Sequence, residues 1–318
     1  MVPPLITLEE HFISSRIPGA WKNFQAFPDH QKSKLASLDD ERLRDIDAGS
    51  CQVQVLSHVC VEAPPNECRE TNDELAAACR KHPKRFVGFA TLPMAHPEAA
   101  ADELERCVKQ LGFVGALIDN HLEDGTFYDD EKFWPVFARA VKLDVPIYLH
   151  PTFASDDMMK HYEGNFSSQA ALMMSIAGWG WHSETGLHIL RLYASGLFDK
   201  YPKLKICVGH MGEFMPFALE RCIRASARFG LERGLQTVWD ENIWITTSGY
   251  FSLAPFACII RSTKMDRIMY SVDYPFSMPV EGLKFVEEIQ KSGLVSEEEL
   301  QMICFKNAER FLGIKVEA

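Results

Sequence analysis

Acidic and histidine side chains stand at the ends of several short apolar runs in this sequence. They are Glu9, Glu10, His11, His58, His150, His210 and Asp273. A single histidine or aspartate at such a place is usually a hydrogen-bonded loop residue, but gathering several in one place costs desolvation energy. A divalent cation offsets that cost, because it neutralises carboxylates and binds imidazoles. The pattern therefore favours a metal site with acid–base chemistry.

The spacing of the first two candidates supports a shared coordination sphere. Glu9 and His11 lie two residues apart in an extended run, so their side chains point the same way, whereas Glu10 points to the other side. His150 and Asp273 can complete the sphere from two other runs. Two imidazoles and two carboxylates with open positions suit Zn²⁺ or Mn²⁺ in a catalytic site.

The elements that must position these residues alternate between apolar runs and longer helical patterns. The eight runs are Leu5–Glu10, Val53–His58, Phe86–Leu92, Gly115–Asn120, Pro146–His150, Lys205–His210, Ile243–Ser248 and Ile268–Asp273. Helical patterns cover Glu98–Leu111, Asp130–Leu143, Thr185–Phe198, Pro216–Phe229 and Val280–Lys291. Near the end of the chain, Ser296 and Glu299 form a capping box, and a last helix over Asn307–Leu312 is expected to end at Gly313.

This alternation predicts a parallel sheet, because each parallel connection needs a crossover. Eight units favour closure into a (β/α)8 barrel, and no G-x-G-x-x-G follows the first run, which argues against a dinucleotide-binding fold. We expect one α/β barrel domain over residues 1–318, with loop insertions after strands 1 and 5. In such a barrel the carboxyl ends of the strands share one rim, where the candidate residues would meet.

Composition excludes several classes of protein. The 318 residues include 33 basic and 44 acidic side chains, for a net charge of −11, whereas a nucleic-acid binder needs a basic face. The longest mostly apolar stretch, Ala170–Trp181, is shorter than the roughly 20 residues that span a bilayer. The nine cysteines are scattered without a CxxC pair, and Met1–Leu8 lacks the pattern of a signal peptide. We therefore expect a cytoplasmic protein that binds neither nucleic acid nor membranes.

The ordered motifs resemble the amidohydrolase superfamily, and specifically its decarboxylase branch. That branch includes 2-amino-3-carboxymuconate-semialdehyde decarboxylase and the 2,3-dihydroxybenzoate and γ-resorcylate decarboxylases. The motifs cover nearly the whole chain. They are Leu8–Phe12, Tyr148–Pro151, Glu184–His188, Ala194–Phe198, Gly209–Glu213, Thr247–Gly249, Ser271–Phe276 and Asn307–Arg310.

The resemblance implies roles for particular residues. The implied metal ligands are Glu9, His11, His150 and Asp273, and the implied catalytic residues are Asp273, His210 and Glu213, with His210 hydrogen-bonded to Glu213. The implied substrate contacts are Arg221, Phe24, Asn120 and Phe276. Arg221 could equally pair with a surface carboxylate, and Glu213 could cap the helix that begins near Pro216. An anionic substrate would enter a positive mouth formed by the cation and Arg221.

The first ligand departs from the wider superfamily, in which many members carry His-x-His on the first strand. Glu9 stands at that position here, and its carboxylate is a harder ligand than imidazole. We therefore expect one divalent ion, with Zn²⁺ as the first choice and Mn²⁺ or Mg²⁺ as alternatives. No organic cofactor is expected. With histidine at position 11, this sequence resembles the γ-resorcylate decarboxylases, because some other benzoate decarboxylases have alanine at that position.

The function that follows from the resemblance is non-oxidative decarboxylation of an ortho-hydroxybenzoate, with Asp273 as the proton donor. Salicylate, its methylated forms, orsellinate, 2,3- or 2,6-dihydroxybenzoate and a pyrimidine carboxylate all fit a chelating acid. Hydrolysis of a lactone or cyclic amide is an alternative, because the same ligands support a metal-bound nucleophile. A second alternative is a catalytically idle metal-binding protein. The family also implies a homodimer or homotetramer, and Ala170–Trp181 is a candidate interface.

Overall fold

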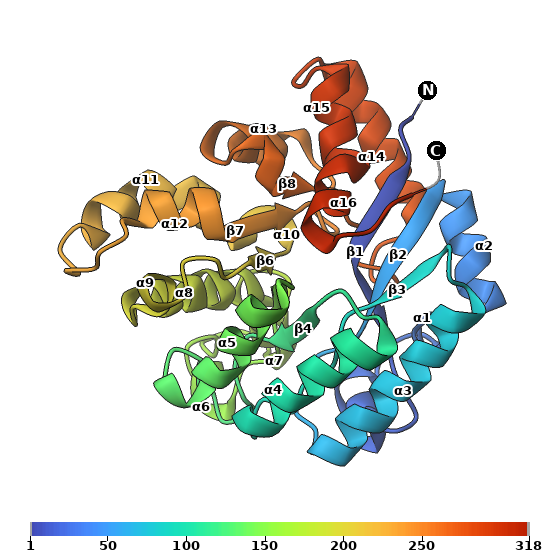
Figure 1. Cartoon of the computed structure of the whole chain (residues 1–318), viewed down its shortest axis with the longest axis horizontal. Helices are drawn as coiled ribbons and strands as arrows, with labels where there is room; N and C mark the ends of the chain where they lie inside the picture. Colours follow the sequence, from blue (N-terminus) through green and yellow to red (C-terminus); the bar gives the residue numbers. More distant parts are fainter. Residues whose placement is uncertain (1, 317–318) are drawn as a thin grey trace.

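The computed structural model describes residues 2–316, and strands and helices alternate along them (Figure 1). Over these residues the strands are β1 (Leu5–Phe12), β2 (Cys51–His58), β3 (Phe86–Gly88), β4 (Ala116–Asp119), β5 (Ile147–His150), β6 (Ile206–Val208), β7 (Ile243–Thr246) and β8 (Ile268–Met269). Neighbouring strands pair in parallel, in the orders β1-β2-β3 and β4-β5-β6-β7-β8. The prediction of a parallel α/β arrangement is confirmed.

Two short contacts close the two sheets into a barrel. Ala90 bridges to Ala116, which joins the end of β3 to β4, and Glu10 bridges to Tyr274, which joins β1 to the segment after β8. At the second seam the backbone N–H of His11 donates to the Tyr274 carbonyl at 2.7 Å. The ends of β1 and β8, which carry predicted ligands, are therefore held side by side.

Helices cover the outside of the barrel (Figure 1). The longer ones are α2 (Asp40–Ala48), α3 (Pro65–Lys81), α4 (Pro97–Arg106), α5 (Trp134–Leu143), α8 (Gly180–Ala194), α11 (Met215–Ser226), α13 (Leu253–Ser262) and α14 (Pro279–Ser292). Several begin with proline at their first or second position, where the missing N–H costs no helical hydrogen bond. Among the described helices, none is both long and apolar enough to cross a membrane.

The barrel interior is filled by apolar side chains from its strands. They include Ile6, Leu8, Val55, Phe89, Leu117, Tyr148, Cys207, Trp244 and Met269. The last helix, α16 (Asn307–Leu312), packs against the starts of the strands, where the rings of Phe311 and Trp244 lie 4.8 Å apart. This end is therefore plugged, and the ionisable residues gather at the opposite ends of the strands.

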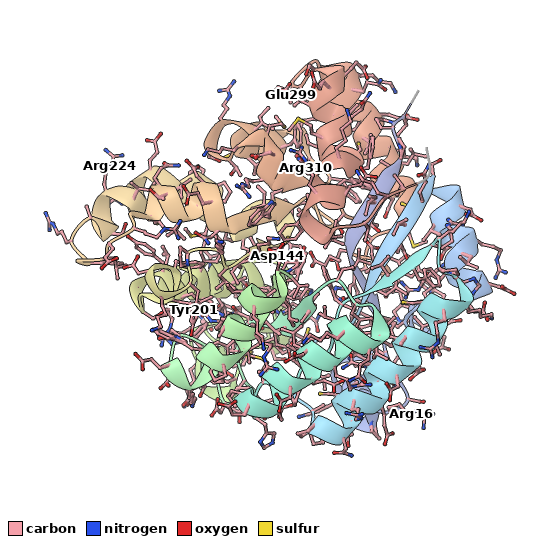
Figure 2. The ribbon with its side chains drawn as sticks, viewed as in Figure 1. Arg16, Asp144, Tyr201, Arg224, Glu299 and Arg310 are labelled. Atoms are coloured by element: carbon pink, nitrogen blue, oxygen red, sulfur yellow. The ribbon has the colours of Figure 1, made fainter. Side chains whose placement is uncertain are left out.

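The local signals near the end of the chain are confirmed. The Ser296 hydroxyl accepts from the Glu299 N–H, and the Glu299 carboxylate accepts from the Ser296 N–H at 2.7 Å, at the start of α15 (Glu297–Gln301) where Figure 2 labels Glu299. Helix α16 ends at Gly313, whose φ of 69° is left-handed. All nine cysteines are free thiols.

Several loops depart from the predicted boundaries. β8 ends at Met269 and β6 ends at Val208, so Asp273 and His210 lie beyond the strands, where their φ angles of 69° and 46° are left-handed. After β1 the chain forms η1 (Pro18–Phe24) and α1 (Asp29–Ala36), and after β5 it forms α6 (Asp156–Met159) and α7 (Ser168–Ser175). That these segments are insertions relative to the family stays a prediction.

Candidate metal centre

The four predicted metal ligands come together at the carboxyl ends of the strands. Glu9 and His11 lie on β1, His150 ends β5 and Asp273 follows β8, and one ligand atom from each lies within 4.8 Å of the others. His11 Nε2 is 3.3 Å from Asp273 Oδ1, and His150 Nε2 is 3.2 Å from Glu9 Oε1. Three of the side chains are buried and Asp273 is half-buried.

Unpartnered atoms in this cluster fit a cation. Glu9 Oε1, His11 Nε2 and Asp273 Oδ1 are buried without a hydrogen-bond partner. Unpaired buried polar atoms are costly, and carboxylate oxygens facing imidazole nitrogens are the donors that a divalent ion satisfies. The residues present therefore fit one divalent metal ion.

Neighbouring polar groups orient three of these ligands. The Tyr148 hydroxyl donates to Glu9 Oε2. Cys60 Sγ lies 3.7 Å from His150 Nδ1, and Ser57 Oγ lies 3.5 Å from His11 Nδ1. Contacts of this kind hold the ring and leave Nε2 for the metal.

Local charges set the protonation states that metal binding needs. Burial disfavours the charged form of Glu9, but His210 and His150 beside it bring the pKa of the carboxyl below its ordinary value. Burial lowers the pKa of His11, although Asp273 opposes the shift. An ionised carboxylate and a neutral imidazole are the ligand forms that bind a cation.

A second cluster adjoins the first through His210. Its Nε2 lies 3.6 Å from Glu9 Oε1 and 3.5 Å from Asp273 Oδ2, while its Nδ1 lies 2.7 Å from Glu213 Oε1. The other Glu213 oxygen lies 2.7 Å from Nδ1 of His182. Burial raises the pKa of Glu213, but His210 and His182 outweigh it and bring the pKa below its usual value. Glu213 is therefore an ionised partner of two histidines and does not cap α11.

The backbone that presents His210 is strained. From His210 to Phe214 the φ angles are 46°, 58°, 85°, 53° and 61°, which is a left-handed turn containing a single glycine, Gly212. Left-handed conformation costs other residues roughly 1–2 kcal/mol each. Such strain clusters at functional sites, and here it folds Glu213 back onto His210.

An aromatic pocket opens onto the metal cluster. It is lined by His11, Phe24, Val59, Cys60, His150, Trp181, His210, Asp273 and Phe276. Phe24 and Phe276 stack with centroids 6.0 Å apart at 23°, and Phe276 lies 5.7 Å from the His11 ring. Both predicted aromatic contacts thus lie in the pocket wall, where a flat ring can pack.

The structure does not bring the other two predicted substrate contacts to this pocket. The Asn120 side chain is buried against His188, with Oδ1 3.2 Å from Nδ1 of that ring. Arg221 is exposed on α11, a helix that runs away from the barrel and carries Arg224 at the outer edge of the molecule (Figure 2). The direction in which the chain leaves the left-handed turn sets this placement.

Acidic side chains gather in a cavity beside the pocket. A larger cavity shares Cys60 with the pocket and is lined by the acidic residues Glu62, Asp119, Glu123, Asp124, Asp156 and Asp157, with Lys22 as its basic member. Burial raises the pKa of Asp119 to about 7, although His150 opposes the shift. Arg221 is exposed on α11 and does not line this cavity, and a positive mouth formed with the cation stays a prediction.

Sequence reasoning missed three residues of the site: Tyr148, Cys60 and Trp181. Tyr148 could have been found, because it lies two residues before His150 on one strand and so shares its side. Trp181 lines the pocket, and its indole Nε1 is buried without a partner. Cys60 lies in the loop after β2 and Trp181 in the first turn of α8, so the alternation along a strand does not indicate where they point.

Comparisons with known proteins agree with this site. Residues 38–314 match the amidohydrolase family. The decarboxylase orsB of Emericella nidulans is 47% identical, with 99% of this chain and 98% of the relative covered. A crystal structure of 2,6-dihydroxybenzoate decarboxylase complexed with 2,6-dihydroxybenzoate is 32% identical, covers 98% of this chain and 100% of its own, and has a TM-score of 0.89.

A dihydroxybenzoic acid decarboxylase of Polaromonas, crystallised with manganese and the inhibitor 2-nitroresorcinol, is 33% identical with a TM-score of 0.88. It covers 98% of this chain and 97% of its own. The chain therefore belongs to the amidohydrolase family, in its decarboxylase branch, and has the α/β barrel of that family. It is a metal-dependent enzyme of this branch, with one divalent ion.

Proposed function

We propose that this chain decarboxylates an ortho-hydroxybenzoate, releasing CO2 and a phenol. The observation that carries the proposal is the half-buried Asp273 carboxyl, which shares one pocket with the stacked rings of Phe24 and Phe276. An aromatic acid can pack flat on these rings while its polar edge faces the ligand cluster. The named activities of the decarboxylase relatives support the same chemistry.

The residues divide the reaction between them. Glu9, His11, His150 and Asp273 would hold a divalent ion, which would supply a Lewis acid for the hydroxyl and carboxylate groups of the substrate. Asp273, when protonated, delivers its proton to the ring carbon that bears the carboxylate. The carbon–carbon bond to CO2 then breaks, its electron pair restores the aromatic ring, and Asp273 regains a proton from solvent.

His210 supports this step from the other side of Asp273. Its Nε2 faces Asp273 Oδ2 and Glu9 Oε1, while Glu213 holds its Nδ1. From this position it can hydrogen-bond the phenolic oxygen as negative charge develops on the ring. Phe24, Phe276 and Trp181 exclude water from the reacting carbon.

A substrate panel with a matched variant tests this function. Salicylate, 2,3- and 2,6-dihydroxybenzoate and orsellinate are incubated with enzyme, and both CO2 and the phenol are measured. For the active substrate, we expect Asp273→Asn to lower kcat about 1,000-fold or more, because proton transfer and a metal ligand are both lost. Ring opening of a lactone without CO2 would favour the hydrolase, and metal binding without any turnover would favour the idle protein.

We propose Zn²⁺ or Mn²⁺ as the resident ion. Two carboxylates and two imidazoles suit either, and the manganese in the Polaromonas relative supports Mn²⁺. Chelation should abolish turnover, and adding Zn²⁺, Mn²⁺ or Mg²⁺ singly to the metal-free protein ranks the ions. If activity survives complete metal removal, as measured by elemental analysis, the metal-dependent reaction is wrong.

We also propose that the chain forms a homodimer or homotetramer. Apolar side chains are exposed on one part of the surface: Leu172, Met173, Met174, Trp179 and Phe217. The first four lie in the predicted interface, Ala170–Trp181. Exposed apolar patches mark interaction sites. The expected cytoplasmic location and the single domain over residues 1–318 stay predictions, which cell fractionation and limited proteolysis would test.

A further inference from the structure

The carboxylate of Glu213 is bracketed by two imidazoles. One is His210, which faces the pocket, and the other is His182, in the first turn of α8 and 2% exposed. His182 Nδ1 lies 2.7 Å from Glu213 Oε2, and its Nε2 lies 3.1 Å from the Ala177 carbonyl oxygen. His182 does not line the pocket; it can act on the reaction through Glu213, and its ring also lies 4.9 Å from the His210 ring.

Counting protons on these contacts fixes the charge of His182. A carbonyl oxygen only accepts hydrogen bonds, so Nε2 of His182 must carry a proton. An ionised carboxylate also only accepts, so Nδ1 must carry one too. Glu213 is ionised, because His210 and His182 outweigh the effect of burial on its pKa. With both nitrogens protonated, the ring of His182 is a buried cation that balances the charge of Glu213.

The surroundings of His182 leave Glu213 as its counter-ion. The titratable groups that face the ring are His210 and Glu213 from α10 (His210–Glu213) and Tyr250 from the segment after β7. The Tyr250 ring lies 5.4 Å away and edge-on, and the Phe214 ring packs at 5.1 Å. Among these neighbours Glu213 is the one carboxylate.

We propose that His182 is a positioning residue for the decarboxylation step: as an imidazolium it holds the Glu213 carboxylate in place and thereby fixes the direction in which His210 Nε2 points into the pocket. The inference rests on the proposed function. Because residues 210–214 form a strained left-handed turn, the Glu213 side chain needs an anchor outside that turn, and His182 on α8 supplies it.

Two substitutions separate this role from simple packing. In His182→Asn the amide nitrogen takes the place of Nδ1, so the bond to Glu213 is kept while the charge and the Ala177 contact are lost. In His182→Phe the ring still packs on Phe214 and Tyr250, but both donors are lost. We expect kcat to fall about 10-fold for Asn and about 100-fold for Phe, with KM changed less than about threefold, because misplacing a catalytic group costs rate.

The control is His188→Gln, which alters another buried histidine of α8, six residues further on and bonded to Asn120. Its kcat should stay within about twofold of the wild type, whatever its melting temperature. A His182→Phe enzyme as active as His182→Asn, or two variants with wild-type kcat, would overturn the positioning role. A wild type that turns over no hydroxybenzoate would instead overturn the proposed function.

A spectroscopic measurement does not depend on how the variants fold. The wild-type holoenzyme is labelled with [15N]histidine at pH 7, and the ring signals of His182 are those that disappear in His182→Asn or, failing that, in His182→Phe. Two protonated ring nitrogens support the imidazolium. A single protonated nitrogen contradicts it, because one of the two contacts of the ring would then have no proton to donate.

Discussion

The ring nitrogens of a buried histidine reveal its charge through their partners. His58, at the end of β2, donates from Nδ1 to the Val59 carbonyl at 2.8 Å, while its Nε2 is buried without a partner. The Phe12 ring packs on it at 5.3 Å. Burial lowers the pKa of His58 to about 4, so this ring is neutral at neutral pH.

The neutral His58 should make stability depend on pH. Its folded pKa lies below the unfolded value of 6.5, so its contribution is complete above about pH 6.5 and is lost as pH falls through about 4. A shift of this size corresponds to about 3 kcal/mol. His58→Asn keeps a donor for Val59 but does not titrate. Urea unfolding from pH 7 to pH 4 should therefore show a steeper loss of unfolding free energy for the wild type.

The quantity to compare is the difference in pH slope between the wild type and His58→Asn, because acid also protonates the metal ligands of both proteins. Equal pH slopes for wild type and His58→Asn would show that His58 titrates normally in the folded chain.

At the scale of the elements, the residue that follows β6 lies against a side chain of β1 at the metal site. A Cβ added at Gly209 would lie 2.3 Å from Glu9 Oε2. The backbone of Gly209, at φ −81°, is one that alanine adopts without strain. Glycine is therefore needed here for space, because the backbone after β6 lies directly against the carboxylate of Glu9.

Gly209→Ala should weaken metal binding without unfolding the barrel. The added methyl group must displace the Glu9 carboxylate, so we expect the Kd for Mn²⁺ to rise about 10-fold or more, as for other changes that misplace ligands. Gly234→Ala is the control, because a Cβ there meets no atom within 4 Å. Titration with Mn²⁺ followed by electron paramagnetic resonance measures both. Unchanged affinity in Gly209→Ala would mean that Glu9 moves freely or does not bind the ion.

The elements also show how far the sequence could predict this molecule. Apolar runs and period-two spacing are local properties of strands, so all eight strands, and Glu9 and His11 on one side of the first, were predictable. The position of Arg221 was not predictable, because it depends on the direction in which α11 leaves the left-handed turn after His210. Asn120 likewise follows a predicted strand, but its partner His188 comes from a distant helix, and no local pattern indicates that contact.

At the scale of the whole molecule, the apolar surface on one side is continuous with the wall of the active site. The Trp179 ring lies 5.0 Å from that of Phe214, and Phe214 and Phe217 both line a groove that also reaches His210. Phe217 is 91% exposed, which leaves a large apolar side chain in water. The residues that line this groove include no carboxylate, so association through the groove would not bring acidic side chains of its lining together.

The homo-oligomer proposed above should therefore depend on Phe217. Burying a phenylalanine side chain contributes about 2 kcal/mol, so Phe217→Ser should raise the Kd of subunit association roughly 30-fold per phenylalanine removed. Phe229→Ser is the control, because Phe229 is also exposed, at 50%, but lies past the other end of α11. Sedimentation at several protein concentrations would measure association in all three proteins. A monomeric wild type at micromolar concentration would contradict the oligomer. Weaker association of Phe229→Ser beside unchanged association of Phe217→Ser would place the interface elsewhere.

Because the groove reaches His210, loss of the oligomer should lower kcat in parallel, and the concentration dependence of activity would show this coupling.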